Sequence, residues 1–406
     1  MSAVKFSIKI CLFIALGSTC FGSIAANNAL PQLVEISQSR LAKSPLSQRS
    51  AIELNSSSWL TGLPSVSLSY LGDLDNSNIY EQELSLNLPI KTFSLHQSDK
   101  QLVQLSQALQ AQQTRLQKLY LSGLLRQSMW DQRLAAVKLN QLERKSRLLS
   151  KLYTQQKKLA DAGELPLVNI LLLEKELVDI ELEQIGFKQQ QTEALTLFTS
   201  LTGLNQLPDD IVEKAIDIGE FSAPEHVQTA LMQHPSWLLH SLQLQQKQLM
   251  LQSQQSGEQD PWTLSLTAKE TAVDQFNDKH LGIGINVPLS FSSALSQSDV
   301  SMWQKDFQEQ SVNGERIYLE LTSQIQRLAI QQQNLRAQQT LLTRGVSLSR
   351  SITENLAQVK NQNQIGYEIW LRRYIDALDT EARLALNQVT LQQLHSQQLQ
   401  ALGISL

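Results

Sequence analysis

Residues 91–125 read KTFSLHQSDKQLVQLSQALQAQQTRLQKLYLSGLL and open a proline-free run that continues to Pro166. Leucines recur within this run near heptad spacing, which is the apolar seam of a coiled coil. The seam consists of Leu102, Leu105, Leu109, Leu116 and Leu119. We therefore predict one helix from Lys91 to Ala162, which at about 1.5 Å per residue would span on the order of 110 Å. A helix of this length needs a packing partner.

The chain supplies that partner after the segment Ala162-Gly163-Glu164-Leu165-Pro166. A glycine just past the end of one helix and a proline in the first turn of the next mark a reversal of chain direction. A second helix is expected to return along the first as far as Leu201-Thr202-Gly203-Leu204. Together the two helices would form a long antiparallel hairpin.

The same construction occurs twice. Four landmarks of the first half recur in the second half at an offset of roughly 200 residues. The pairs are Pro64 with Pro261, Pro89 with Pro288, Gly163 with Gly366, and Gly203 with Gly403. We interpret the chain as a tandem duplication, with repeats at 27–204 and 226–406 joined by a linker at 205–225.

The first 26 residues have the pattern of a cleavable secretory signal. Lys5 and Lys9 precede an apolar run from Ile10 to Leu16, and small residues follow up to Ala26. Lipid attachment at Cys20 is an alternative, although the leucine usual three places upstream is missing. Both cysteines, Cys11 and Cys20, lie in this segment. The mature chain would therefore have neither a disulfide nor a thiolate metal ligand.

Each repeat contains two segments in which apolar and polar residues alternate, as in β-strands with one apolar face. We predict strands around Pro64–Leu71 and Glu83–Leu88, and again from Trp262 to Thr267 and from Leu281 to Val287. Two ordinary hairpins over a soluble core would give the same alternation. Two features favour lipid as the contact of the apolar face. The secretory signal directs the chain out of the cytoplasm, and the apolar seams of the predicted helices are too narrow to offer a broad core. The residues predicted to face lipid are Val66, Leu68, Tyr70, Leu84, Leu86, Leu88, Leu264, Leu266, Ile283 and Ile285.

No stretch of about twenty apolar residues follows the signal, so entry into a membrane would require a closed β-barrel. Four strands cannot close one, since about eight is the smallest common number. Three copies would supply twelve. The net charge of -4 argues against a nucleic-acid partner. Apolar residues recur at helical spacing between the many glutamines. This pattern places the glutamines on the solvent-exposed faces of long helices.

This order of elements resembles the TolC-type outer-membrane efflux channels over essentially the whole mature chain. The resemblance rests on a strand pair ending at Asn87-Leu88-Pro89-Ile90, the Ala162-Gly163-Glu164 tip, His234-Pro235, and the repetition of the pattern. It implies a mainly α chain with a small β part. Three copies would form a twelve-stranded transmembrane barrel and a twelve-helix α-barrel. The short chain and the tip are more similar to the CzcC-like, heavy-metal-efflux branch than to the larger drug-efflux members.

The resemblance also implies partners and a location. The homotrimer would sit in the lipid of the bacterial outer membrane, extend into the periplasm, and dock onto a periplasmic adaptor and an inner-membrane pump, for which the RND type is one candidate. The docking tips would be Gly163 and Glu164 in the first repeat, and Gly366 and Tyr367 in the second.

Members of this family often carry acidic residues after the second tip, where the periplasmic end narrows. This chain has Arg372 and Arg373 there, with Glu368 and Asp376 nearby. The arginines would form rings at the aperture and pair with these carboxylates, or they would belong to a solvated helix face without a gating role. Trp370 and Tyr374 are expected to pack between helices.

Residues typical of catalysis are sparse. The six histidines are scattered, no pair has zinc-site spacing, and His234 before Pro235 reads as a helix start. Nucleophile elbows and phosphate-binding loops do not occur, so we predict no enzymatic activity, no cofactor and no metal site. The sequence favours an exit duct of a tripartite efflux system for small molecules or metal ions. The alternative is a secreted coiled-coil structural or adaptor protein without a pore.

Overall fold

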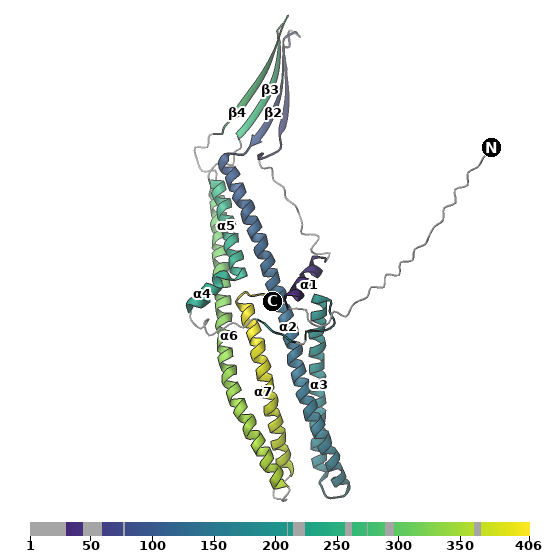
Figure 1. Ribbon diagram of the computed structural model, residues 1–406. Helices are drawn as coiled ribbons and strands as arrows, with labels where there is room; N and C mark the ends of the chain where they lie inside the picture. Colours follow the sequence, from purple (N-terminus) through teal and green to yellow (C-terminus); the bar gives the residue numbers. More distant parts are fainter. Residues whose placement is uncertain are drawn as a thin grey trace, which may run out of the picture.

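The computed structural model describes residues 30–43, 59–75, 78–208, 210–213, 224–255, 262–273, 275–288, 296–360 and 367–406. It is elongated, with a β-sheet at one end and two helical hairpins extending away from it (Figure 1). The signal segment 1–26 and the second tip glycine, Gly366, lie outside the described residues.

The described elements follow a similar order in both halves of the chain, except that one helix precedes the strands in the first half and two helices precede them in the second. The first half contains α1 (Leu30–Ala42), β1 (Ser65–Gly72), β2 (Tyr80–Ile90), α2 (Phe93–Asp161) and α3 (Leu167–Thr202). The second half contains α4 (Pro224–Gln233), α5 (Pro235–Gln255), β3 (Trp262–Val273), β4 (Phe276–Asn286), α6 (Gln297–Lys360) and α7 (Tyr367–Ala401). In each half a very long helix, of 69 or 64 residues, is followed by a helix about half as long, of 36 or 35 residues.

The long first helix is confirmed. It begins after Thr92, whose hydroxyl accepts a hydrogen bond from the backbone N–H of Leu95 at 3.2 Å and thereby caps the helix. Along its first half Leu109, Gln112 and Leu119 are buried at heptad spacing, as the apolar seam requires. Gln112 donates through Nε2 to the carbonyl of Pro235, 3.2 Å away, which ties α2 to the start of α5.

Left-handed glycines end three of the helices. Gly163, Gly203 and Gly403 have φ of +77°, +78° and +77°, a conformation that side chains with a Cβ resist. Gly203 and Gly403 follow α3 and α7, about 200 residues apart, so the two halves end on the same backbone feature.

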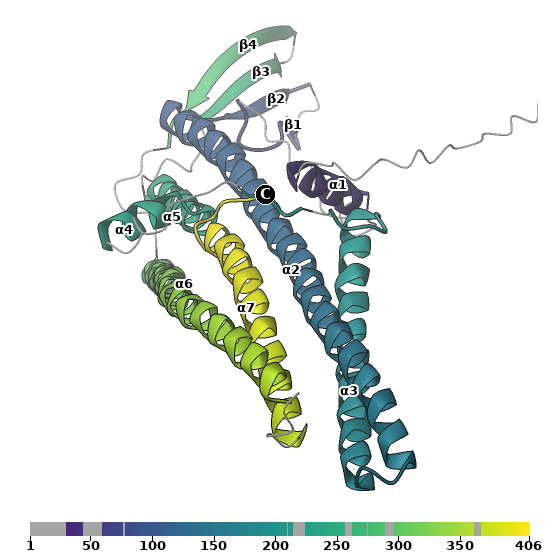
Figure 2. The same ribbon diagram turned by 60° about the horizontal axis from the view of Figure 1, so that its bottom comes forward.

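The helices form a layer in the order α3, α2, α7, α6, because α2 packs against both α3 and α7, and α7 packs against α6. On one side of this layer α1 covers Leu121, Leu125 and Met129 of α2, together with Phe198 of α3. The helix α4 packs in the same manner on α6 and α7 through Val227 and Leu231. Figure 2 shows α1 and α4 beside the layer rather than within it.

The four strands form one antiparallel sheet in the order β1-β2-β3-β4. Each repeat contributes a hairpin, and β2 pairs with β3 across the two repeats in a register that sets Leu86 opposite Leu266. Three of the four strands, β2, β3 and β4, are longer than the sequence predicts, whereas β1 has the predicted length and is shifted by one residue. In β2 the additional residues begin at Tyr80, and in β4 they begin at Phe276, where charged side chains interrupt the alternation. The sheet stands clear of the helical layer (Figure 1).

Candidate functional site

One face of the sheet carries all ten of the apolar residues singled out in the sequence. Cross-strand partners lie on the same face, and the register aligns the apolar side chains in rows that run across the four strands. The rows are Leu68–Leu84–Ala268–Leu281, Val66–Leu86–Leu266–Ile283 and Leu88–Leu264–Ile285, with Tyr70 next to the first row. Leu68 is 78%, Ile283 80% and Leu281 92% exposed, so within the described residues nothing covers the greater part of this face.

The opposite face of the sheet is polar. Ser67, Ser85, Thr267 and Gly282 form one row, and the hydroxyls of Ser85 and Thr267 lie 3.2 Å apart. Nearer the outer end of the sheet Lys269 pairs with Glu81 at 2.6 Å. The sheet is thus amphipathic across its whole width.

Aromatic residues mark both ends of the apolar face. At the end away from the helices Tyr70 stacks on Tyr80, with ring centroids 6.1 Å apart, beside an ion pair between Glu270 and Lys279 at 3.6 Å. At the end next to the helices Trp262 pairs with Ile90. Aromatic residues flanking an apolar band are typical of strands that cross a membrane.

The first hairpin tip is built as the sequence predicts. The backbone N–H groups of Gly163 and Glu164 donate to the carbonyls of Ala160 and Leu159, both at 2.9 Å, and close the end of α2. Glu164 is exposed, and nothing lies within 4 Å of the position where a Cβ on Gly163 would stand. Leu167, in the first turn of α3, is 67% exposed. In the second repeat Tyr367 begins α7.

The residues predicted to lie at the aperture are near the start of α7. Arg372, Arg373 and Asp376 are exposed, and Arg373 approaches Asp376 of the same helix at 3.5 Å. Among the described residues, this long contact is the only ion pair that these three side chains form. Trp370 stacks on Tyr374, with centroids 5.3 Å apart, and packs against the cluster of Leu149, Leu152, Leu173 and Ile180. Trp370 therefore packs between helices, as expected, and Tyr374 is stacked on it.

His234 is the helix-start residue that the sequence predicts. It separates α4 from α5, and its Nδ1 accepts a hydrogen bond from the backbone N–H of Ser236 at 3.2 Å. The ring is 4% exposed, and Gly403 is packed so closely that a Cβ there would lie 2.8 Å from it. Burial lowers the pKa of His234 to about 4, because the charged imidazolium would lose its hydration.

Sequence reasoning missed an ion pair at the centre of the molecule. Arg126 of α2 binds Glu213 through Nε at 3.0 Å, and donates through Nη1 to Gln400 at 2.6 Å and to the carbonyl of Ile404 at 2.9 Å. The two charged side chains are only 5% and 6% exposed. One guanidinium thereby joins the segment after α3 to the segment after α7. The partners are too distant in sequence to be recognised as a motif.

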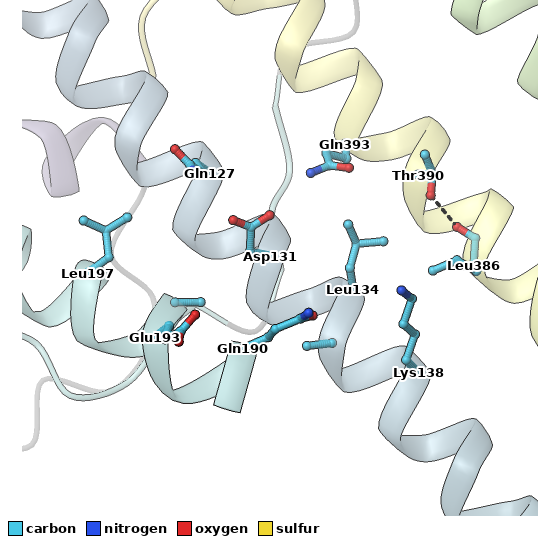
Figure 3. A pocket seen from close by; sticks show the side chains of 12 residues that line it. Gln127, Asp131, Leu134, Lys138, Gln190, Glu193, Leu197, Leu386, Thr390 and Gln393 are labelled. Carbon is cyan, nitrogen blue, oxygen red and sulfur yellow. Dashed lines mark hydrogen bonds between the residues drawn. The ribbon is translucent and has the colours of Figure 1, made fainter. Parts of the chain in front are cut away.

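Sequence reasoning also missed a groove over α2. A cavity of about 640 Å³ opens between α3 and α7 with α2 as its floor (Figure 3). Its lining comprises Gln127, Asp131, Leu134, Ala135, Lys138, Gln190, Glu193, Ala194, Leu197, Leu386, Thr390 and Gln393. Burial raises the pKa of Asp131, and a hydrogen bond from Gln127 partly offsets this effect.

Groups suited to hold a metal ion do not gather in the described part of the chain, where no cluster of three or more His, Cys, Asp or Glu residues occurs. Among the helices that the structure describes, none is both long and apolar enough to cross a lipid bilayer.

Comparison with solved structures identifies the fold. The Campylobacter jejuni CmeC outer membrane channel is 15% identical, with a TM-score of 0.61 over 93% of this chain and 83% of that one. The outer membrane protein VceC of Vibrio cholerae is 14% identical, with a TM-score of 0.65 over 93% and 96%. The open state of the MtrE outer membrane channel of Neisseria gonorrhoeae is 13% identical, with a TM-score of 0.62 over 92% and 89%. No family model and no curated relative matches the chain by sequence.

Proposed function

The chain has the fold of the outer-membrane channels, and we propose that it is the exit duct of a tripartite efflux system in a bacterial outer membrane. The observation that carries the proposal is the exposed apolar face of the sheet, with its rows in register across four strands and a polar reverse side. In this proposal the apolar face contacts lipid, the polar face lines the passage, and the helices extend into the periplasm. Export then needs no bond-breaking chemistry, and we propose that the protein is not an enzyme.

The dimensions of the sheet support a membrane location. Strands of 8 to 12 residues bracket the roughly 9–11 residues that a tilted strand needs to cross a bilayer. Exposed leucines and isoleucines are unfavourable in water by about 25 cal/mol for each Å² of apolar surface, and lipid removes this cost. A soluble sheet would instead place such a face against its own helices, which here lie beyond one end of the sheet (Figure 1).

The helical layer supports assembly of several copies. Its two outer helices each carry an apolar stripe on the side turned away from their own chain. The stripe on α3 consists of Val168, Leu171, Val178, Leu182 and Ile185, and the stripe on α6 consists of Val312, Leu319, Ile330, Leu341 and Leu348. On α6 the steps from Val312 to Ile330 and from Ile330 to Leu348 are five whole turns each. We propose that α3 of one copy packs on α6 of the next.

Three copies are proposed because four strands per chain then give a barrel of twelve. Closure would also pair β1 of one copy with β4 of its neighbour, which are the two edges of the sheet. The repeat boundaries 27–204 and 226–406, with the linker 205–225, belong to the same proposal.

A periplasmic adaptor and an inner-membrane pump are the proposed partners at the hairpin tips, through Gly163 and Glu164 and through Gly366 and Tyr367. Exposed Leu167 gives the first tip an apolar contact for them. A pump of the RND type and a metal cargo, as in the CzcC-like branch, are the finer form of this proposal. Arg372, Arg373 and Asp376 are proposed to lie at the aperture.

Fractionation of cells that express the full chain tests the proposal. The protein should enter the outer-membrane fraction, migrate as a trimer after detergent extraction, and conduct ions in planar bilayers. A pool found only in the periplasm, without conductance, would instead support the coiled-coil structural or adaptor protein.

A further inference from the structure

The groove over α2 lies on the side of the helical layer opposite α1. The helix α1 packs on Leu121, Leu125 and Met129 of α2. At 3.6 residues per turn, Gln127 points about 200° and Leu134 about 180° away from Leu125. The groove therefore opens on the face that α1 leaves uncovered. If the layer is the wall of a duct, as proposed above, this uncovered face is the inner one.

The lining of the groove combines an apolar surface with an excess of negative charge. Leu134, Leu197 and Leu386 come from three different helices, and Asp131 and Glu193 stand between them (Figure 3). The ammonium of Lys138, the only cation of the lining, lies over the ring of Phe187, 4.6 Å from its centroid. Part of its charge is thus directed to an aromatic face, and the two carboxylates dominate the groove.

We propose that this groove is a binding site for small organic cations that combine an apolar body with a single positive charge. The inference depends on the proposed duct only for the statement that the groove faces the passage. A volume of about 640 Å³ lies within the range of pockets that bind small molecules. The apolar body would rest on the leucines and the charge would lie near Asp131, whose partly buried carboxylate gains a counter-ion.

A second cavity extends the groove across the layer toward α6. It has a volume of about 510 Å³ and shares Gln127, Asp131 and Gln393 with the first. Its own wall carries Arg327 and Arg126, of which Arg126 is bound to Glu213. The arginines in the wall of this second cavity repel a positively charged ligand. The charge of the ligand is therefore held on the side of Asp131 that faces α3.

Calorimetric titration of the purified full chain tests the site. Benzyltrimethylammonium is the probe, and benzenesulfonate is an anion of similar size. We expect the cation to bind and the anion to bind at least about tenfold more weakly. Asp131→Asn should weaken cation binding at least about threefold, the effect of losing one partly exposed charge pair. Glu183→Gln, on the exposed part of α3, is the matched control and should leave binding unchanged.

A second variant guards against a loss of fold. Gln190→Trp places a bulky ring at an exposed position on the rim, so it should block binding while circular dichroism and trimer elution stay unchanged. Equal binding of cation and anion, or equal binding by the wild type and Asp131→Asn, would overturn the site.

Conductance in planar bilayers is measured on the same preparations. A protein that conducts ions but does not prefer the cation refutes the groove alone, whereas one that prefers the cation but does not conduct refutes the duct alone.

Discussion

Arg126 and Glu213 form a buried ion pair that joins the middle of α2 to the segment after α3, with Nε and Oε2 3.0 Å apart. The same guanidinium reaches Gln400 and the carbonyl of Ile404, so the linker after the first repeat and the end of the second repeat converge on one side chain.

Removing one partner of this pair should destabilise the fold strongly. Glu213→Gln leaves the guanidinium of Arg126 buried without its counter-ion, and we expect a loss of about 3–5 kcal/mol in the free energy of unfolding. Chemical denaturation of the purified protein measures it. The control is Glu320→Gln, which removes the exposed pair between Arg316 and Glu320 and should cost at most about 1 kcal/mol. Equal losses in both variants would show that Arg126 does not depend on Glu213.

A charge on the apolar face of the sheet should impair membrane assembly. Leu84→Arg is expected to cost about 2–4 kcal/mol if the residue lies near the bilayer midplane, and the amount of trimer in the outer membrane should fall. Ser67→Arg, on the polar face of the neighbouring strand, is the control. Ser67 suits this purpose better than Ser85, which is 8% exposed and bound to Thr267. Equal trimer yields in the two variants would refute the lipid contact.

Substitution at the first tip should separate assembly from export. Gly163→Leu forces a side chain into φ of +77° at a cost of about 1–2 kcal/mol, but it meets no atom within 4 Å. Trimers should therefore form while efflux-dependent resistance is lost, because the added side chain occupies the proposed docking surface. Thr114→Leu, at an exposed position in the first half of α2, controls for a bulkier apolar side chain on a helix. Normal resistance in Gly163→Leu would place docking elsewhere.

The buried imidazole of His234 should make stability depend on pH. Its pKa in the folded state, about 4, lies below the value near 6.5 of the unfolded chain. Between these two pH values the histidine is protonated in the unfolded state but not in the folded state, and this difference favours unfolding. Stability should fall between about pH 6.5 and 4, by on the order of 3 kcal/mol in total.

His234→Asn tests this dependence, since asparagine can accept the capping hydrogen bond from Ser236 but does not titrate. The variant should lose less stability on acidification than the wild type. His280→Asn, on the exposed strand β4, is the control. Parallel stability curves for the wild type and His234→Asn would contradict the assignment.

Local patterns allowed most of the fold to be predicted. Heptad spacing predicted the long helix, in which Leu109 and Leu119 are buried, and Gly163 predicted the reversal of the chain after it. Both predictions succeeded because each pattern lies within a few residues of the element that it determines. Strand ends were less predictable, since side chains such as Glu81 and Lys279 break the alternation although the ladder continues through them.

The long-range contacts could not be predicted. Asp131 resembles any other acidic residue on a helix, and its groove exists only because α3 and α7 flank α2 in space. Arg126 likewise looks like a surface residue until its partners from distant segments are placed around it.

The seam between β2 and β3 has a consequence for the order in which the chain folds. Ser85 and Thr267 meet across this seam although 182 positions separate them, whereas Ser265 and Gly284, within one hairpin, are 19 apart. Contacts between distant positions form slowly because the entropy of closing the loop is lost before the contact stabilises it. We therefore expect that within one chain the helices and the two β-hairpins form before the central seam of the sheet.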